Sequence, residues 1–221
     1  MDKSTINMIK LFIFNQSSSA AVFGIGTYIR ELTTALEGCD INVSIIHLLS
    51  DKSDVETEEI DGVRQWYIPS PITIITNEVQ KDCYYRNIFY LLRLYIVKRE
   101  NKENIIFHIN YLNCKILVDS LSAFFECKII LVVHYLDSII SLLGNISRLH
   151  TIISQSDEPS DKVEKFAKES FLKEKEMLQS RRIDKIICLS NNTFDMLHKY
   201  YQIEKDRMVV IYNGLSDISA G

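Results

Sequence analysis

The chain has 221 residues, of which 47% are hydrophobic and 24% are charged, and its formal net charge at pH 7 is -4. This composition can form a buried core and excludes an intrinsically disordered chain. The negative charge argues against a nucleic-acid-binding protein, because such proteins neutralise phosphates with lysine and arginine.

The apolar runs and the cysteines indicate the compartment. No apolar run reaches the roughly 18 residues that a membrane-spanning helix needs, and Met1–Asn7 is polar, unlike a signal peptide. The five cysteines are scattered without a CxxC pair, which favours core side chains in a reducing compartment over a zinc site. We therefore expect a cytoplasmic protein that forms one large domain or a tight pair.

The chain begins with a predicted strand, loop and helix. The apolar residues Ile9–Phe14 predict a central strand that is covered on both faces. A polar loop follows, and the helix beginning near Gly24 and Gly26 ends at the predicted capping residue Gly38. In an open parallel sheet such a loop lies where these folds bind ligands, and its glycines let backbone N–H groups approach an oxyanion. The apolar stripe of this helix consists of Ile25, Ile29, Leu32 and Leu36.

The rest of the chain alternates apolar strands with amphipathic helices. The further predicted strands are 41–49, 63–68, 104–110, 127–134, 185–189 and 208–212, with a polar loop at 50–59. The further predicted helices are 79–98, a short helix around 117–124, an interrupted segment at 138–156, a charged solvated helix at 161–178, and 191–200 capped by Ser190 or Asn191. The predicted inward stripe of the helix at 79–98 is Tyr84, Ile88, Leu91 and Tyr95. This alternation predicts an α/β fold with a Rossmann-like, mainly parallel sheet and helices on both faces.

A nicotinamide-binding Rossmann domain, of an oxidoreductase or an epimerase, is one hypothesis. Gly24-x-Gly26 hints at the fingerprint of that class, and Asp51 follows the second predicted strand, where it would hold a ribose. The spacing argues against this hypothesis, because Asn15–Phe23 separates the strand from Gly24 and the third glycine position is Ile29.

Five segments in a fixed order point to another class. They are Gly24–Leu32 (GIGTYIREL), Ile106–Asn110, Val132–Asp137, Asp184–Ser190 and Val209–Gly214. Over nearly the whole chain, this order resembles the amino-terminal, acceptor-side domain of GT-B glycosyltransferases, and in particular the family 4-like ones. Two details depart from that pattern: Ile25 separates two glycines that are often adjacent, and Tyr135-Leu136 separate His134 from Asp137.

The resemblance implies a hexosyltransferase of polysaccharide biosynthesis. Its substrates would be a nucleoside-diphosphate sugar donor and a glycan or lipid-linked acceptor, with retention and with neither a metal nor another cofactor. Residues 8–214 would form the GT-B amino-terminal domain after a polar extension at 1–7, and 215–221 would begin the interdomain linker. The carboxyl-terminal donor-binding domain does not follow in this sequence, so we expect the chain alone to be inactive. A non-catalytic glycan-binding module is the further alternative.

Residues at the carboxyl ends of the predicted strands form the candidate site. His134 follows the apolar residues Ile129–Val133 and is the predicted catalytic residue. Its imidazole would hydrogen-bond sugar hydroxyls and have an unshifted pKa of ~6.5. His47 is predicted to be structural. No metal ligand is predicted, and the predicted substrate-binding residues are Asn15, Gly24, Gly26, Thr27, His108, Asn110, Asp137 and Asn213.

The segment Ser138–Ile153 carries apolar residues close to Arg148 and His150. One interpretation is a peripheral contact with the inner face of an anionic membrane, which would bring the enzyme to a lipid-linked acceptor. The other, which we favour from the usual burial of apolar side chains, is that Leu142, Leu143 and Ile146 pack inside the domain or against the second one.

Overall fold

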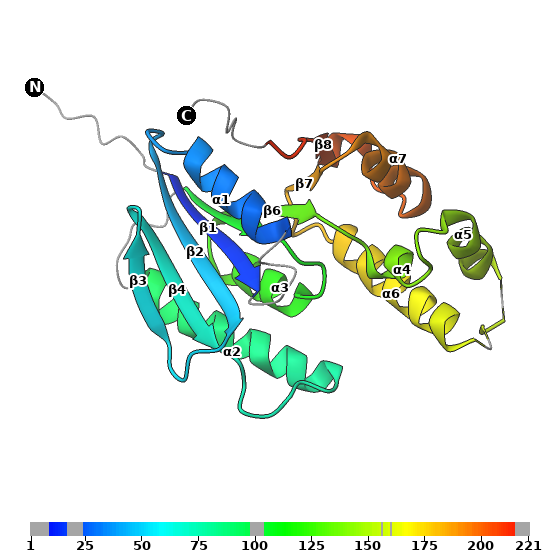
Figure 1. Ribbon diagram of the computed structural model, residues 1–221, viewed down its shortest axis with the longest axis horizontal. Helices are drawn as coiled ribbons and strands as arrows, with labels where there is room; N and C mark the ends of the chain where they lie inside the picture. Colours follow the sequence, from blue (N-terminus) through cyan, green and yellow to red (C-terminus); the bar gives the residue numbers. More distant parts are fainter. Residues whose placement is uncertain (1–8, 17–23, 98–103, 156, 160, 215–221) are drawn as a thin grey trace, which may run out of the picture. The chain divides into compact units, whose positions relative to one another are not determined.

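The computed structural model describes residues 9–16, 24–97, 104–155, 157–159 and 161–214 (Figure 1). The strands are β1 Ile9–Gln16, β2 Ile41–Ser50, β3 Glu56–Ile60, β4 Val63–Pro69, β5 Ile105–Ile109, β6 Cys127–Val133, β7 Lys185–Cys188 and β8 Met208–Val210. The helices are α1 Gly26–Ala35, α2 Glu78–Val97, α3 Lys115–Phe124, α4 Asp137–Ile140, α5 Ile146–Ser154, α6 Lys162–Leu178 and α7 Asn191–Tyr200, with a 3₁₀ turn at Lys205–Arg207.

The eight strands form one sheet in the order β3-β4-β2-β1-β5-β6-β7-β8. The pairs β1–β2, β1–β5, β2–β4 and β7–β8 are parallel, whereas β3–β4 is antiparallel. The predicted α/β class with a mainly parallel sheet is therefore confirmed.

The chain divides into two compact units, which we describe separately. The first comprises the described parts of Met1–Asn110, Cys114–Ile130 and Asn213–Gly221, and the second comprises Tyr111–Asn113 and Leu131–Tyr212. The predicted extension at 1–7 and the predicted linker at 215–221 lie outside the described residues.

In the first unit, helices cover both faces of the sheet. Ile13 pairs in register with His108 of β5, and the His108 ring meets Tyr28 of α1, so α1 lies on the face of the odd-numbered β1 side chains. On the other face, Gln16 Nε2 donates to the Tyr85 hydroxyl of α2 at 2.9 Å. Figure 1 shows α1 in front of the strands and α2 behind them.

Aromatic side chains fill the core of the first unit. The Phe107 ring is fully buried, with centroids 5.6 Å from Phe12, 6.1 Å from Phe14 and 5.5 Å from Phe125. Burying one such side chain contributes roughly 2–3 kcal/mol to the stability of the fold. The uninterrupted buried stretch of β1, Leu11–Asn15, confirms the predicted central strand.

Two predictions in the first unit are wrong. The predicted loop at 50–59 contains most of β3, which pairs with β4 through an Asp61-Gly62 turn where both residues have positive φ. Every β3 residue is exposed, so no apolar alternation marks the strand.

The inward stripe of α2 also differs from the predicted one, because Tyr95 is 44% exposed. Four buried residues follow i, i+4 spacing, which winds around a long helix: Tyr84, Ile88, Leu92 and Ile96. Tyr85 is buried beside Tyr84.

The second unit joins short parallel strands to four helices. The β7–β8 pairing continues past β8, where the Ile211 N–H donates to Cys188 O at 3.0 Å. Ser190 caps α7 through the Thr193 N–H, as predicted. The interrupted segment at 138–156 forms α4 and α5, which are separated near Gly144 with φ +83. The prediction of a solvated α6 is only partly correct, because it buries Ala167, Phe171, Glu174, Met177 and Leu178.

Candidate functional site

Asn15 and Asn110 lie at the carboxyl ends of adjacent strands in the first unit. Asn15 belongs to β1 and not to the predicted loop, and its side chain is buried. Asn110 follows β5 directly, and its Nδ2 donates to Phe14 O at 2.9 Å. The structure therefore brings these two predicted residues to one edge, where Asn110 also ties β5 to β1.

His108 of β5 joins this edge to the first turn of α1. The His108 Nε2 and the Tyr28 hydroxyl are 3.3 Å apart, and the two ring centroids are 5.8 Å apart. His108 is buried, and burial raises the pKa of Tyr28 to about 12, so the hydroxyl stays protonated at neutral pH. Tyr28 was not predicted as a site residue, although its place in the first turn of the glycine-preceded helix was a usable signal.

His47 of β2 extends the same polar edge and was predicted to be only structural. Asn15 Nδ2 donates to His47 Nδ1 at 3.2 Å, and His47 Nε2 donates to Gln65 Oε1 on β4 at 2.8 Å. The Tyr67 hydroxyl donates to the same Gln65 oxygen at 3.3 Å, and its ring stacks on His47 with centroids 4.7 Å apart. Asn15 pairs in register with His47, and His47 pairs with Tyr67, so these side chains share one face.

The start of α1 presents backbone rather than side chains. Ile25 stands at the N-cap and makes no side-chain capping bond, and the first turn that contains Gly26 and Thr27 has no acidic residue. Among the described residues, a Cβ added to Gly24 would meet no atom within 4 Å. Such a helix start suits a polar or anionic ligand group. The rest of the predicted loop, residues 17–23, lies outside the described residues.

His134 and Asp137 belong to the second unit. His134 directly follows β6 and is half-buried, and burial lowers its pKa to about 4, so the prediction of an unshifted pKa is wrong. The ring is therefore neutral over the physiological range and can offer one donor and one acceptor. Asp137 is exposed and begins α4. Asn213, the last predicted residue, is exposed.

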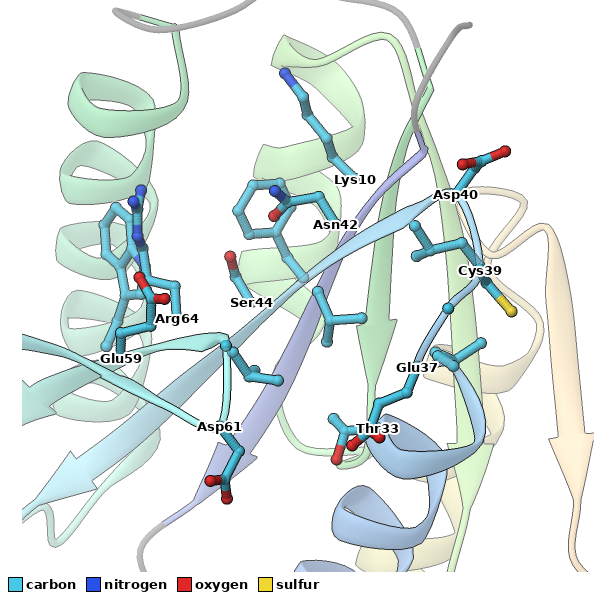
Figure 2. A pocket seen from close by; sticks show the side chains of 18 of the residues that line it. Lys10, Thr33, Glu37, Cys39, Asp40, Asn42, Ser44, Glu59, Asp61 and Arg64 are labelled. Carbon is cyan, nitrogen blue, oxygen red and sulfur yellow. The ribbon is translucent and has the colours of Figure 1, made fainter.

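A cavity of about 640 Å³ lies at the opposite edge of the first unit, at the amino ends of β1 and β2. Figure 2 shows Arg64 and Glu59 of the β3–β4 hairpin on one side of it and Thr33 and Glu37 of the α1 end on the other. Parallel folds bind ligands at the carboxyl ends of their strands, so we place the candidate site at the other edge. The charges around the cavity also define no ligand class, because both signs occur: Lys10, Glu37, Asp40, Glu59, Asp61 and Arg64.

The described residues contain neither a metal-ligand cluster nor a membrane-spanning helix. No group of three or more His, Cys, Asp or Glu residues there is arranged to hold a metal ion. No helix in the described ranges has both the length and the apolar character needed to cross a membrane.

The architecture is shared with solved glycosyltransferase structures. Sucrose-phosphate synthase from Thermosynechococcus elongatus has a TM-score of 0.65 at 16% identity, covering 94% of this chain and 48% of that one. The catalytic domain of starch synthase IV from Arabidopsis thaliana, bound to ADP and acarbose, has a TM-score of 0.57 at 13% identity, covering 95% and 52%. A glycosyltransferase from Rickettsia africae has a TM-score of 0.54 at 16% identity, covering 95% and 44%. The chain thus spans about half the length of these structures and has the fold of one half of a GT-B glycosyltransferase.

The family follows from the sequence match. The model described as Glycosyltransferase Family 4 matches residues 22–217, and the chain therefore belongs to glycosyltransferase family 4. The resemblance seen in the sequence is confirmed. A comparison with curated proteins finds no match.

Proposed function

We propose that this chain is the acceptor-side domain of a hexosyltransferase that uses a nucleoside-diphosphate sugar and a glycan or lipid-linked acceptor. The observation that supports this most is the polar edge formed by Asn15, His47, His108 and Tyr28 beside the first turn of α1. It stands at the carboxyl ends of parallel strands, in a chain of family 4.

The side chains of the polar edge are better suited to hydrogen-bonding sugar hydroxyls than to acting as nucleophiles. A neutral imidazole, side-chain amides and a protonated phenol each offer hydrogen bonds of defined direction to hydroxyl groups. Glycosyl transfer needs a cation-like sugar and a leaving diphosphate to be stabilised, which calls for fixed donors and an oriented acceptor. In this proposal Asn15 and His108 orient the acceptor, and His134 in the second unit hydrogen-bonds the transferred sugar.

The donor sugar would be held mainly by the other half of a GT-B enzyme. The solved structures are about twice as long as this chain, and we propose that turnover, with retention and no cofactor, requires that half. A role in polysaccharide synthesis in the cytoplasm, at the inner membrane face, is the setting we propose. The five cysteines, none of which forms a disulfide, are consistent with a reducing compartment.

The test is to titrate the 221-residue chain with sugars and to monitor the backbone amide signals by NMR. Methyl hexopyranosides and short oligosaccharides are expected to shift the amide signals around Asn15, His108 and Asn110. Asn15→Ala should weaken this binding about tenfold, the value of one or two hydrogen bonds. Asn42→Ala is the matched control, because it removes an exposed amide at the amino end of β2.

Two results would contradict the proposal. Sugar-induced shifts confined to the cavity residues 37–42 would place the sugar site at the amino ends of β1 and β2 instead of at the carboxyl ends. Micromolar binding of NAD in calorimetry, with no response to sugars, would favour the dinucleotide-binding hypothesis instead.

A further inference from the structure

The two hydrogen bonds of His47 define one tautomer of its ring. An amide nitrogen only donates, so Asn15 Nδ2 requires a lone pair on His47 Nδ1. An amide oxygen only accepts, so Gln65 Oε1 requires a proton on His47 Nε2. Both neighbours therefore select the same neutral form, with its hydrogen on Nε2. Burial is the largest influence on His47 and lowers its pKa below 6.5, so this neutral form prevails at pH 7.

We propose that His47 is a positioning residue for the polar edge. It holds the Asn15 side-chain amide with the amide nitrogen toward β2. The amide oxygen, an acceptor for hydroxyl protons, is then turned away from the His47 ring. His47 need not touch the ligand in order to fix which atom Asn15 presents. This inference rests on the proposed function of the carboxyl edge.

The groups around His47 make this arrangement depend on a single proton. Glu58 of β3 attracts positive charge on the ring, but burial outweighs it. Tyr67 of β4 stacks on the ring and stays protonated, since burial raises its pKa to about 12, and the Lys52 ammonium lies 5.5 Å from the centre of the Tyr67 ring. If His47 gained a second proton, its Nδ1–H would face the Asn15 Nδ2–H. Two donors cannot bond, so the Asn15 amide would have to turn over.

The first experiment needs no ligand. Long-range ¹H–¹⁵N spectra of the 221-residue chain report which His47 nitrogen carries the proton, and the Asn15 side-chain NH₂ signals report the amide. We expect the Nε2–H form at neutral pH, and we expect the Asn15 signals to change with the same midpoint as the His47 ring. An Nδ1–H tautomer, or Asn15 signals that ignore the protonation of His47, would overturn the proposal.

Two variants separate positioning from a merely structural role. Gln65→Glu keeps the acceptor for Nε2–H and adds a negative charge beside the ring, so the midpoint sensed by Asn15 should rise by about one pH unit. His47→Phe keeps an aromatic ring against Tyr67 but removes both hydrogen bonds, so the pH response of Asn15 should vanish. His150→Gln, at an exposed position in the second unit, should leave the Asn15 signals unchanged. Melting curves for each variant exclude an unfolded sample.

A second measurement links the proton to binding, with methyl α-D-glucopyranoside, methyl α-D-galactopyranoside and methyl α-D-mannopyranoside as probes. In folded His47→Phe, affinity for the sugar that binds the wild type should fall about tenfold. In Gln65→Glu, the loss of sugar affinity on acidification should begin at a higher pH than in the wild type. Unchanged affinity in His47→Phe, with altered Asn15 signals, would overturn the positioning role. If no sugar binds the wild type, the proposed function fails, and the tautomer and Asn15 measurements still decide whether His47 sets the Asn15 amide.

Discussion

The buried carboxylate of Glu174 in α6 holds Ser138 at the start of α4 by two hydrogen bonds. Its Oε1 accepts from the Ser138 backbone N–H at 3.1 Å, and its Oε2 accepts from the Ser138 hydroxyl at 2.6 Å. The Tyr201 hydroxyl donates to the same Oε2 at 2.8 Å. Because Ser138 follows Asp137 directly, this carboxylate holds the first turn of α4, which Asp137 begins.

Glu174→Gln is expected to remove a pH dependence of stability. Burial is the main reason that the pKa of Glu174 is raised above 4.5, so between 4.5 and the raised value the folded chain binds a proton that the unfolded chain releases. By linkage, this group makes the free energy of unfolding fall as pH rises through that window. Glutamine has no such proton, so the variant should gain stability relative to the wild type as the pH rises from 4.5 through the raised pKa of Glu174. Urea unfolding across this range measures it.

Glu174→Ala tests the same network by deletion. Three donors, the Ser138 N–H and two hydroxyls, lose their buried acceptor, and we expect a loss of about 2–4 kcal/mol in the free energy of unfolding. The control is Glu169→Ala, at an exposed position of the same helix, which should change stability by about 0.5 kcal/mol or less. Equal effects of the two alanine variants would show that the Glu174 bonds contribute little.

His134→Ala should change pH dependence in the opposite direction. Burial lowers the pKa of His134 from 6.5 to about 4, so between these values the unfolded chain binds the proton and the folded chain does not. The wild type therefore loses stability as pH falls from 6.5 to 4, by at most about 3 kcal/mol from this group. The variant should lack that loss and be about 1–2 kcal/mol less stable at pH 7. Thermal melting from pH 4 to 7 would show parallel curves if the prediction is wrong.

Turnover in an enzyme that contains both halves separates a catalytic His134 from a structural one. If His134 hydrogen-bonds the transferred sugar, as we propose, His134→Ala should lower turnover about 100-fold. His150→Ala, at an exposed position, is the control and should leave turnover unchanged. Normal turnover by the folded fraction of His134→Ala would show that the residue is structural.

The sequence predicted the strands well because buried parallel strands are uninterrupted apolar runs. It missed β3 because that strand is exposed at every residue, and only the Asp61-Gly62 turn could have indicated a hairpin. It also misjudged Glu174 by treating α6 as a charged face. The spacing of Phe171, Glu174 and Leu178 at i, i+3 and i+7 did place that carboxylate on the buried stripe.

The candidate site was predicted only in outline. Strand ends identified Asn15, His108 and Asn110, because the carboxyl ends of parallel strands meet at one edge. Their partners depend on the register between strands and on the placement of α1, which residue patterns do not encode. For that reason Tyr28 was not predicted, and His47 was not expected to contact Asn15.

Tyr28→Phe should weaken the contact between the start of α1 and the polar edge. The change removes only the hydroxyl that contacts His108 Nε2, and we expect a loss of about 1 kcal/mol in unfolding free energy. The ¹⁵N signals of the His108 ring should move, and binding of the methyl hexosides should fall about fivefold. Tyr90→Phe, at a position of α2 that is 58% exposed, is the control. An unmoved His108 signal would show that the contact is not made in solution.

Leu143→Asn tests whether the exposed apolar tip between α4 and α5 contacts a membrane. Leu143 is 97% exposed and Ile146 is 36% exposed, so neither packs inside the described chain. Of the interpretation that we favoured from the sequence, this leaves packing against the second domain. Leu143 also has φ +52, a conformation that asparagine tolerates better than leucine. The variant should therefore be as stable as the wild type, or more stable by about 0.5–1 kcal/mol. We expect the wild type to sediment with phosphatidylglycerol vesicles at low salt, and the variant to bind them about tenfold more weakly. Leu172→Asn makes the same change at an exposed position of α6 and should retain vesicle binding. If the wild type stays in the supernatant, the membrane contact is contradicted, and packing of the apolar tip against the other half of the enzyme is favoured.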